Sequence, residues 1–264
     1  MTNALPCAPS GGKPPNRRQF QIETYLRIAR SLRRISQLMN VLTDDELDRL
    51  IPLLSERRFD ARQLLFSAGE VPERVFLILK GRVKLYHTSS NGKEVIIDIA
   101  GKGDLVGDMA ILEGADHTVY ARALEQTVVV TICWDDFFYL VQRSPRLAFT
   151  MAELMARRLA GVQRTLINLV SKPVSGRLAD ALLDRVDGDD LRLGLTHEEL
   201  GQTIGTSRET VTALLSRFVT LGAIEPAPGG YRLANEELLR EISTGAVTVS
   251  PRHPVRGQPT APKS

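Results

Sequence analysis

The sequence predicts an α+β protein with an N-terminal β-roll or jelly roll, a long helix, and a C-terminal winged helix-turn-helix. Three observations predict this fold. Short runs rich in β-branched residues alternate with glycine turns between about residues 58 and 133. From 144 to 172, apolar residues recur at steps of four and three, which is typical of a helix with one apolar stripe. Residues 196–218 have the pattern of two short helices around a glycine turn, and 222–233 that of a strand, a turn and a strand.

The β-roll is expected at residues 41–143. It opens with a capping box, in which Thr43 caps a short helix and Glu46 stands at the third helical position. Strands separated by glycine-containing turns are typical of a sandwich or jelly roll. The runs that predict strands lie at 75–79, 83–86, 95–99 and 128–132, and the turns at 80–81, 90–92 and 101–103.

The long helix, expected at 144–172, opens with Ser144-Pro145, and proline is favoured in the first helical turn. Starting from Ala148, its apolar residues follow the a/d spacing of a two-stranded coiled coil, so we expect a homodimer. An ordinary buried helix is the alternative interpretation. The predicted dimer seam comprises Ala152, Met155, Leu159, Val162, Leu166 and Leu169.

The helix-turn-helix at 196–218 contains two further capping boxes, Thr196 with Glu199 and Thr206 with Glu209. Gly201 has no side chain, so a second helix can cross close to it. Gly205 suits a turn that needs a positive φ. With the apolar residues turned inward, the remaining side chains face outward and form a candidate DNA-binding set of Thr196, His197, Thr206, Ser207, Arg208, Glu209, Thr210, Thr212 and Arg217.

Two of these side chains have the chemistry to read base edges in the major groove of double-stranded DNA. Arg208 is able to donate two hydrogen bonds to a guanine, and Glu209 to accept one from a cytosine amine. The alternative is structural, with Glu209 acting only as the capping partner of Thr206 and Arg208 only as a solvated charge.

The remaining segments define the expected boundaries. The winged helix-turn-helix domain is expected at 173–243, with a hinge at Ser171–Pro173 and a loop at 187–190. Residues 1–40 are expected to form a partly disordered basic extension, in which 20–39 is a basic helix. We expect the proline-rich tail at 244–264 to be disordered.

Composition excludes several classes of protein. The formal net charge of +3 is too small to indicate nucleic-acid binding by itself. Two distant cysteines, Cys7 and Cys133, predict no disulfide framework, zinc site or iron–sulfur cluster. No apolar run is long enough to span a membrane and no signal peptide is recognisable, so a cytoplasmic protein without a membrane partner is expected. The chain lacks the common catalytic motifs and the paired histidines of cupin enzymes, so we expect no enzyme activity and no cofactor.

Four short segments of the helix-turn-helix are informative: Leu195-Thr196, Glu199–Gly201, Ile204-Gly205 and Ser207–Val211. Together they resemble the DNA-binding signature of the CRP/FNR family of bacterial transcription regulators. The resemblance covers about residues 40–240. It implies that Arg208 and Glu209 read bases, that a homodimer binds palindromic promoter sites, and that the protein contacts RNA polymerase. Ala213 stands where family members that resemble the cyclic AMP receptor carry a second arginine. Part of the DNA half-site is therefore expected to be read differently, or not at all.

The segments at 79–83 and 103–112 resemble those of a cyclic-nucleotide-binding β-roll of the same family, and the resemblance implies an effector pocket. Asp108 stands where a glutamate would hold the ribose, and His117 where an arginine would hold the phosphate. These departures predict either an effector other than cyclic AMP or no effector; a cyclic AMP response through an atypical phosphate pocket is the alternative. The candidate pocket comprises Gly107, Asp108, Met109, His117, Thr118, Val119, Arg122, Arg158, Val162 and Gln163.

Overall fold

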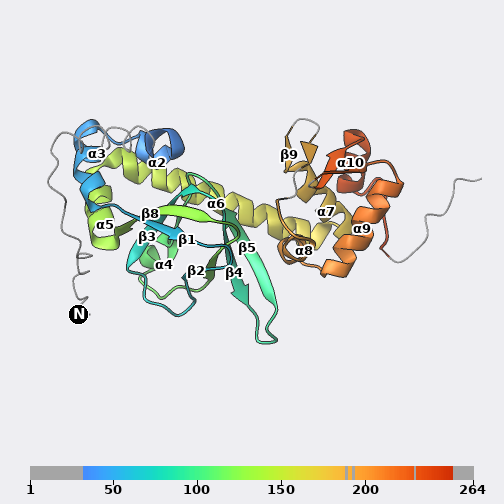
Figure 1. Ribbon diagram of the computed structural model, residues 1–264, viewed down its shortest axis with the longest axis horizontal. Helices are drawn as coiled ribbons and strands as arrows, with labels where there is room; N and C mark the ends of the chain where they lie inside the picture. Colours follow the sequence, from blue (N-terminus) through green and yellow to red (C-terminus); the bar gives the residue numbers. More distant parts are fainter. Residues whose placement is uncertain (1–31, 188–189, 192–193, 229, 252–264) are drawn as a thin grey trace, which may run out of the picture. The chain divides into compact units, whose positions relative to one another are not determined.

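The computed structural model describes residues 32–187, 190–191, 194–228 and 230–251 (Figure 1). The chain divides into two compact units, and the division falls inside the long helix between Ala160 and Gly161. The two units are therefore described separately. Most of the predicted basic extension and residues 252–264 of the predicted tail lie outside the described residues.

The first unit begins with a short helical stretch that ends at Ile35, followed by α2 (Gln37–Asn40). The predicted continuous helix at 20–39 is wrong at Ser36, whose backbone is extended with φ −127° and ψ 133°. On either side of the break, Leu32, Leu38 and Met39 are buried in one apolar cluster.

The predicted capping box on α3 (Asp44–Leu50) is confirmed. The Thr43 hydroxyl accepts a hydrogen bond from the Glu46 amide at 3.2 Å, and the Thr43 amide donates to the Glu46 carboxylate at 2.8 Å. A short 3₁₀ turn, Ile51–Leu53, leads from α3 into the first strand.

Two four-stranded antiparallel sheets form the β-roll, in the orders β1-β8-β3-β6 and β2-β7-β4-β5 (Figure 1). All four predicted strand runs are present, and the prediction of a β-roll is confirmed. The strands are β1 (Ser55–Phe59), β2 (Leu64–Phe66), β3 (Arg74–Lys80), β4 (Val83–Thr88), β5 (Glu94–Ala100), β6 (Leu105–Val106), β7 (Tyr120–Ala123) and β8 (Thr127–Cys133).

β3 of the first sheet is buried on both faces, and alternate residues of a strand point to opposite sides. In β3, Phe76 and Ile78 pack toward the second sheet in one apolar cluster, whereas Val75 and Leu77 pack toward helices in another. The helical cover includes α3, α5 (Trp134–Arg143) and the start of α6 (Pro145–Ser171). α5 and the short α4 (Asp108–Glu113) were not anticipated from the sequence.

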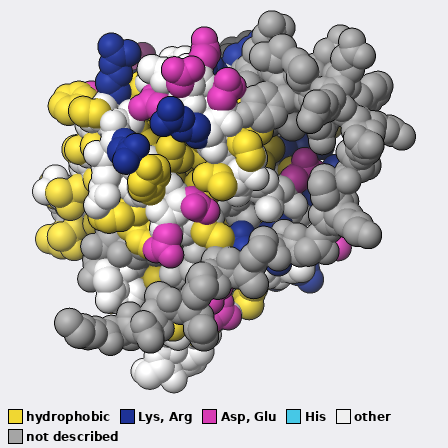
Figure 2. All heavy atoms as spheres, turned by 90° about the vertical axis from the view of Figure 1, so that its left-hand side faces the viewer, with side chains coloured by type: hydrophobic (Ala, Val, Ile, Leu, Met, Phe, Trp, Pro, Cys, Tyr) yellow, Lys and Arg dark blue, Asp and Glu magenta, His cyan; other side chains and the backbone are white. Residues whose placement is uncertain are grey.

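Figure 2 looks onto the left-hand side of Figure 1, where α3 and α5 lie. Exposed apolar residues of this unit include Leu53, Phe138 and Tyr139. Among the side chains coloured in this view, hydrophobic groups are interspersed with both basic and acidic ones. The coloured part of this face therefore does not form a continuous basic surface of the kind that nucleic acids attract.

The long helix expected at 144–172 is confirmed as α6. Its first turns are anchored by Leu147 and Met151, which are buried in the first unit. Further along, Leu159, Val162 and Leu166 are more than half exposed in the single chain. The start of α6 is thus an ordinary buried helix, and its later turns present an uncovered apolar stripe; the dimer stays a prediction.

The described part of the second unit contains the end of α6, the helices α7 (Val174–Leu183), α8 (His197–Ile204), α9 (Arg208–Thr220) and α10 (Glu236–Thr244), and a small sheet in the order β11-β12-β10-β9 (Figure 1). The wing prediction is confirmed by β11 (Ile224–Ala227) and β12 (Gly230–Leu233).

Two predictions for this unit are corrected. The expected loop at 187–190 belongs to a hairpin of β9 (Val186–Asp187) and β10 (Asp190–Leu191), because β12 pairs with β10 and extends the wing sheet. The tail is not uniformly disordered from 244, since Val249 is buried and the Val247 amide donates to the Glu241 carbonyl at 3.2 Å. In the described part of the chain, no helix is both long and apolar enough to cross a membrane.

Candidate DNA-reading surface and effector pocket

The sequence positions α8 through its cap and its glycines. Thr196 and Glu199 form the predicted capping box, with the Glu199 amide 3.2 Å from the Thr196 hydroxyl. Gly205 ends α8 in the left-handed conformation, with φ 70° and ψ 46°. A Cβ atom on Gly201 would lie 2.9 Å from the Thr206 carbonyl oxygen, so only glycine lets the turn approach α8 this closely.

The predicted capping box of Thr206 with Glu209 is wrong. The Thr206 amide donates to the Gly201 carbonyl at 2.8 Å, which closes the end of α8, so the next helix starts one residue later than expected. Ser207 is the cap of α9, and its hydroxyl accepts from the Thr210 amide at 3.3 Å. Glu209 lies in the first turn, where hydrogen bonds from its own amide and from Ser207 lower the pKa of its carboxyl.

The outer face of α9 lies opposite its buried stripe. Ser207, Arg208, Glu209 and Thr212 are exposed, while Thr206, Thr210 and Arg217 are half-buried. The side chains of the inner stripe have essentially no exposed surface; they are Val211, Leu214, Leu215 and Phe218. The burial of one face holds the other in a fixed direction.

His197 connects the two helices of the motif. Its Nδ1 atom lies 2.9 Å from the Thr212 hydroxyl, which also donates to the Arg208 carbonyl at 2.9 Å. Two members of the predicted DNA-binding set therefore hold each other in place, in addition to presenting polar atoms at the surface.

In the β-roll, the structure brings together two of the predicted pocket residues, Asp108 and Arg158. Arg158 Nη1 donates to both carboxylate oxygens of Asp108, at 2.9 and 3.1 Å, and Nη2 donates to the Leu105 carbonyl. Only 1% of the Asp108 side chain is exposed, against 27% of the Arg158 side chain. Burial raises the pKa of the Asp108 carboxyl, and the adjacent guanidinium opposes that rise.

His117 and Arg122 each have partners other than Asp108. The buried His117 ring stacks on Phe66 with the ring centres 3.9 Å apart, and burial lowers the pKa of its imidazole. Arg122 donates to Glu94 at 2.9 Å and lies over the Tyr86 ring, 4.6 Å from its centre. Arg122 is therefore already paired with a carboxylate, and burial favours the neutral form of the His117 imidazole.

The other predicted pocket residues are more scattered. Gly107 has a φ of 86°, and a Cβ there would lie 3.0 Å from the Arg74 carbonyl, so the position requires glycine. Met109 is half exposed, Thr118 is exposed, and Val119 packs against the core between the sheets. Val162 and Gln163 are exposed on the part of α6 that belongs to the second unit.

The seam residues of α6 are mostly uncovered in one chain. Leu159 is 59% exposed, Leu166 61% and Leu169 42%, whereas Met155 is half-buried and Ala152 exposed. Side chains of this size and polarity gain free energy when they leave water. The stripe therefore has the composition of a surface that a second helix would cover.

The sequence analysis did not identify the structural role of two basic residues near the C-terminal end of α6, Lys172 and Arg177. Lys172 forms an ion pair with Asp180 at 2.7 Å, and Arg177 donates to the carbonyls of Lys172 and Ile204, each at 2.9 Å. No motif marks them; the signal that the sequence does contain is a pair of charged residues, Arg177 and Asp180, within the mostly small and apolar α7.

Comparisons with known proteins agree with this architecture. Residues 56–144 match the family model of the cyclic nucleotide-binding domain, and residues 176–242 match the Crp-like helix-turn-helix domain. A relative from Thermus thermophilus named "Cyclic AMP receptor protein" is 30% identical over 211 residues, which cover 80% of this chain and 98% of that protein. The "cAMP-activated global transcriptional regulator CRP" of Salmonella typhimurium is 29% identical over 181 residues, covering 66% of this chain and 86% of that protein.

A solved structure supports the fold. The regulator CLP of Xanthomonas campestris, described as c-di-GMP responsive, has a TM-score of 0.64 at 20% identity and covers 73% of this chain and 100% of that one. Fold and relatives together define a DNA-binding transcription regulator with a β-roll domain, and not an enzyme. The chain belongs to the CRP/FNR family.

Proposed function

We propose that the protein is a homodimeric regulator that binds palindromic promoter sites with α9 in the major groove. The observation that carries the proposal is the first turn of α9, where Arg208 and Glu209 are exposed on a helix whose inner stripe is fully buried. A helix held in this way presents its first turn to base edges, and a guanidinium beside a carboxylate offers both donors and an acceptor. We propose that base reading is assisted by Ser207, Thr210 and Thr212. The DNA phosphate backbone is proposed to be contacted by Thr196, His197, Thr206 and Arg217.

The dimer is proposed to form along α6. Two half-sites of a palindrome lie one helical turn apart, so a reader of this type needs two linked copies. The exposed stripe of Leu159, Val162 and Leu166 supports this pairing. We accordingly assign 41–143 to a sensing domain, 144–172 to dimerisation and 173–243 to DNA binding, with contact to RNA polymerase and action in the cytoplasm, where promoters are read.

For the β-roll, we propose an effector other than cyclic AMP, or none. The Arg158 guanidinium is already paired with the Asp108 carboxylate, and the His117 ring is stacked on Phe66. Neither Arg158 nor His117 therefore offers an unpaired cation to a cyclic phosphate. A cyclic AMP response is the second candidate, favoured by the name of the Thermus relative and by the presence of Arg158 beside the pocket carboxylate.

Selection from random duplex DNA tests the central proposal. The protein should enrich an inverted repeat, and sedimentation of the complex should give two protein chains per DNA. Binding to a single half-site should be much weaker at the same salt concentration, since only one α9 is then engaged. A protein that sediments as a monomer and enriches no sequence would refute the proposal.

A further inference from the structure

The joint between α6 and the helix-turn-helix is held by specific side-chain contacts. α6 ends at Ser171, and Pro173 caps α7, so the backbone connection is short. A short connection still allows rotation about its dihedral angles. The direction of α8 and α9 relative to the end of α6 therefore depends on the side chains that bridge them.

Arg177 bridges the ends of two helices. Its Nε donates to the carbonyl of Ile204, the last residue of α8, at 2.9 Å. Its Nη1 donates to the carbonyl of Lys172 at 2.9 Å and reaches that of Leu169 at 3.5 Å, both at the end of α6. The last carbonyls of a helix have no partner within it and carry partial negative charge, so a guanidinium is well suited to join them.

The geometry needs an arginine. The guanidinium presents its donors in a rigid planar fork, so one side chain can bond two helix ends at a fixed angle. A lysine ammonium is a point donor on a flexible stem, which is able to bond either end without fixing the angle between them. Arg177 is partly buried, and burial lowers the pKa of its guanidinium.

A packing contact supports the same joint. A Cβ atom on Gly205 would lie 3.0 Å from Leu169 Cδ2, so the turn between α8 and α9 rests directly on the last turns of α6. Leu169 is also the last residue of the proposed dimer seam. The turn that leads into the recognition helix is thus in contact with the end of the proposed dimer interface.

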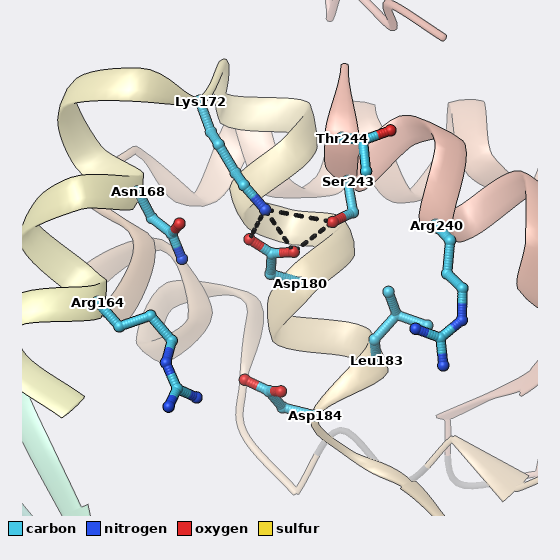
Figure 3. A pocket seen from close by; sticks show the side chains of 9 residues that line it. All are labelled: Arg164, Asn168, Lys172, Asp180, Leu183, Asp184, Arg240, Ser243 and Thr244. Atoms are coloured by element: carbon cyan, nitrogen blue, oxygen red, sulfur yellow. Dashed lines mark hydrogen bonds and ion pairs between the residues drawn. The ribbon is translucent and has the colours of Figure 1, made fainter. Parts of the chain in front are cut away.

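Lys172 adds a second set of contacts to the joint (Figure 3). At a hollow of about 380 Å³, its ammonium donates to both oxygens of Asp180, at 2.7 and 2.9 Å, and to the Ser243 hydroxyl at 3.3 Å. The Ser243 hydroxyl also donates to Asp180. The end of α6 is therefore bonded to α7 and α10 through Lys172 and to α8 through Arg177.

We infer that Arg177 is a positioning residue that fixes the direction of the helix-turn-helix relative to α6, and so sets the half-site spacing that the dimer accepts. The inference rests on the proposed function, because spacing has meaning only for a dimer on a palindrome. One inserted base pair moves a half-site by about 3.4 Å and turns it by about 35°. A joint held rigidly rejects that change, whereas a loosened joint follows it.

The test compares Arg177→Lys with wild type on palindromes whose half-sites are moved apart or together by single base pairs. Wild type should prefer one spacing by about tenfold or more, and the variant should bring that ratio to within about threefold. The penalty for changing a base inside the half-site should remain that of wild type. Arg240→Lys is the matched control, since Arg240 bonds Glu236 within its own helix, and it should keep both preferences.

Other outcomes separate this inference from the proposed function. If Arg177→Lys lowers affinity for every spacing alike, Arg177 has only a structural role and the inference is overturned. Melting temperatures establish that each variant is folded, and Arg177→Met, which keeps the apolar stem without the charge, replaces the lysine variant if that one unfolds. If wild type itself prefers no paired site, the proposed function fails, and the inference fails with it.

Discussion

At the scale of single residues, the N-terminal turn of α9 concentrates the side chains that we propose read the DNA sequence. Ser207 caps the helix, and Arg208 and Glu209 follow it at the exposed end. The neighbouring hydroxyl of Thr212 is engaged by His197. Because the cap and this link are satisfied within the protein, Arg208 is the strongest donor left to bond a base.

Replacing Arg208 with alanine should therefore cost about 1–3 kcal/mol per half-site at the contacted base pair. The loss arises because one bidentate contact to a guanine edge disappears while the helix remains capped. Gel-shift titrations against the selected site, with and without a substitution at that base pair, measure it. Arg240→Ala, which removes a charge from α10, is the control and should leave the sequence preference unchanged. An unaltered preference in Arg208→Ala would show that this arginine reads no base.

His117 makes the stability of the β-roll depend on pH. Burial lowers the pKa of its imidazole in the folded state, although Glu70 and Asp116 partly oppose this. The unfolded chain therefore binds a proton first, near the ordinary value of about 6.5. The contribution to stability is complete above that pH and is lost as the pH falls toward the folded pKa, with a slope of at most about 1.4 kcal/mol per pH unit.

Urea unfolding at about pH 7.5 and about pH 5.5 checks this dependence. His117→Phe keeps a ring against Phe66 and should reduce the loss of unfolding free energy at the lower pH. His87→Gln removes an exposed imidazole as a control and should behave like wild type. The same acid sensitivity in His117→Phe and wild type would assign the effect to other groups.

At the scale of elements, α6 combines an anchored start with an exposed apolar stripe, which we propose a second copy covers. Leu159→Glu should break the dimer, because it places two facing carboxylates at an a position of the seam. The neighbouring residue Ala160 lies at a b position, which faces away from a partner helix, so Ala160→Glu is the control. Sedimentation should show a monomer for the first variant and a dimer for the second. A stable dimer of Leu159→Glu would place the interface elsewhere.

The sequence predicted the elements whose signals are local. The capping box of Thr196, the positive φ of Gly205 and the apolar spacing of α6 each act within a few residues, so the pattern alone located them. The sequence pattern did not predict the elements whose structure depends on contacts between residues far apart in the chain. Both segments that flank the break at Ser36 reach the core, and the hairpin β9–β10 forms because Asp190 pairs with Arg232.

The candidate sites divide in the same way. The outer face of α9 follows from helical periodicity, so its residues were found from the sequence, although the cap is Ser207 and not Thr206. The partner of Asp108 was not predictable, because Arg158 lies 50 positions away and several arginines were equally eligible. Arg177 was missed for the same reason, since its value depends on carbonyls that the fold brings together.

At the scale of the whole molecule, the question is whether the β-roll controls DNA binding through a cyclic nucleotide. A cyclic phosphate needs an uncommitted cation, because burying its charge unpaired costs several kcal/mol. Arg158 is bonded to Asp108 and Leu105, Arg122 to Glu94, and His117 is a buried, stacked imidazole. The arrangement is satisfied without a ligand, so adding one would break existing ion pairs.

We therefore expect cyclic AMP to leave the affinity for DNA unchanged in wild type. Calorimetry with cyclic AMP, together with gel shifts in its presence and absence, measures both binding and its consequence. His117→Arg is the informative comparison, since it restores a guanidinium at the position where the family holds the phosphate, and it should bind the nucleotide more tightly than wild type does. A micromolar dissociation constant for wild type, accompanied by DNA binding that switches on, would instead mean that Arg158 or Arg122 leaves its carboxylate to meet the phosphate.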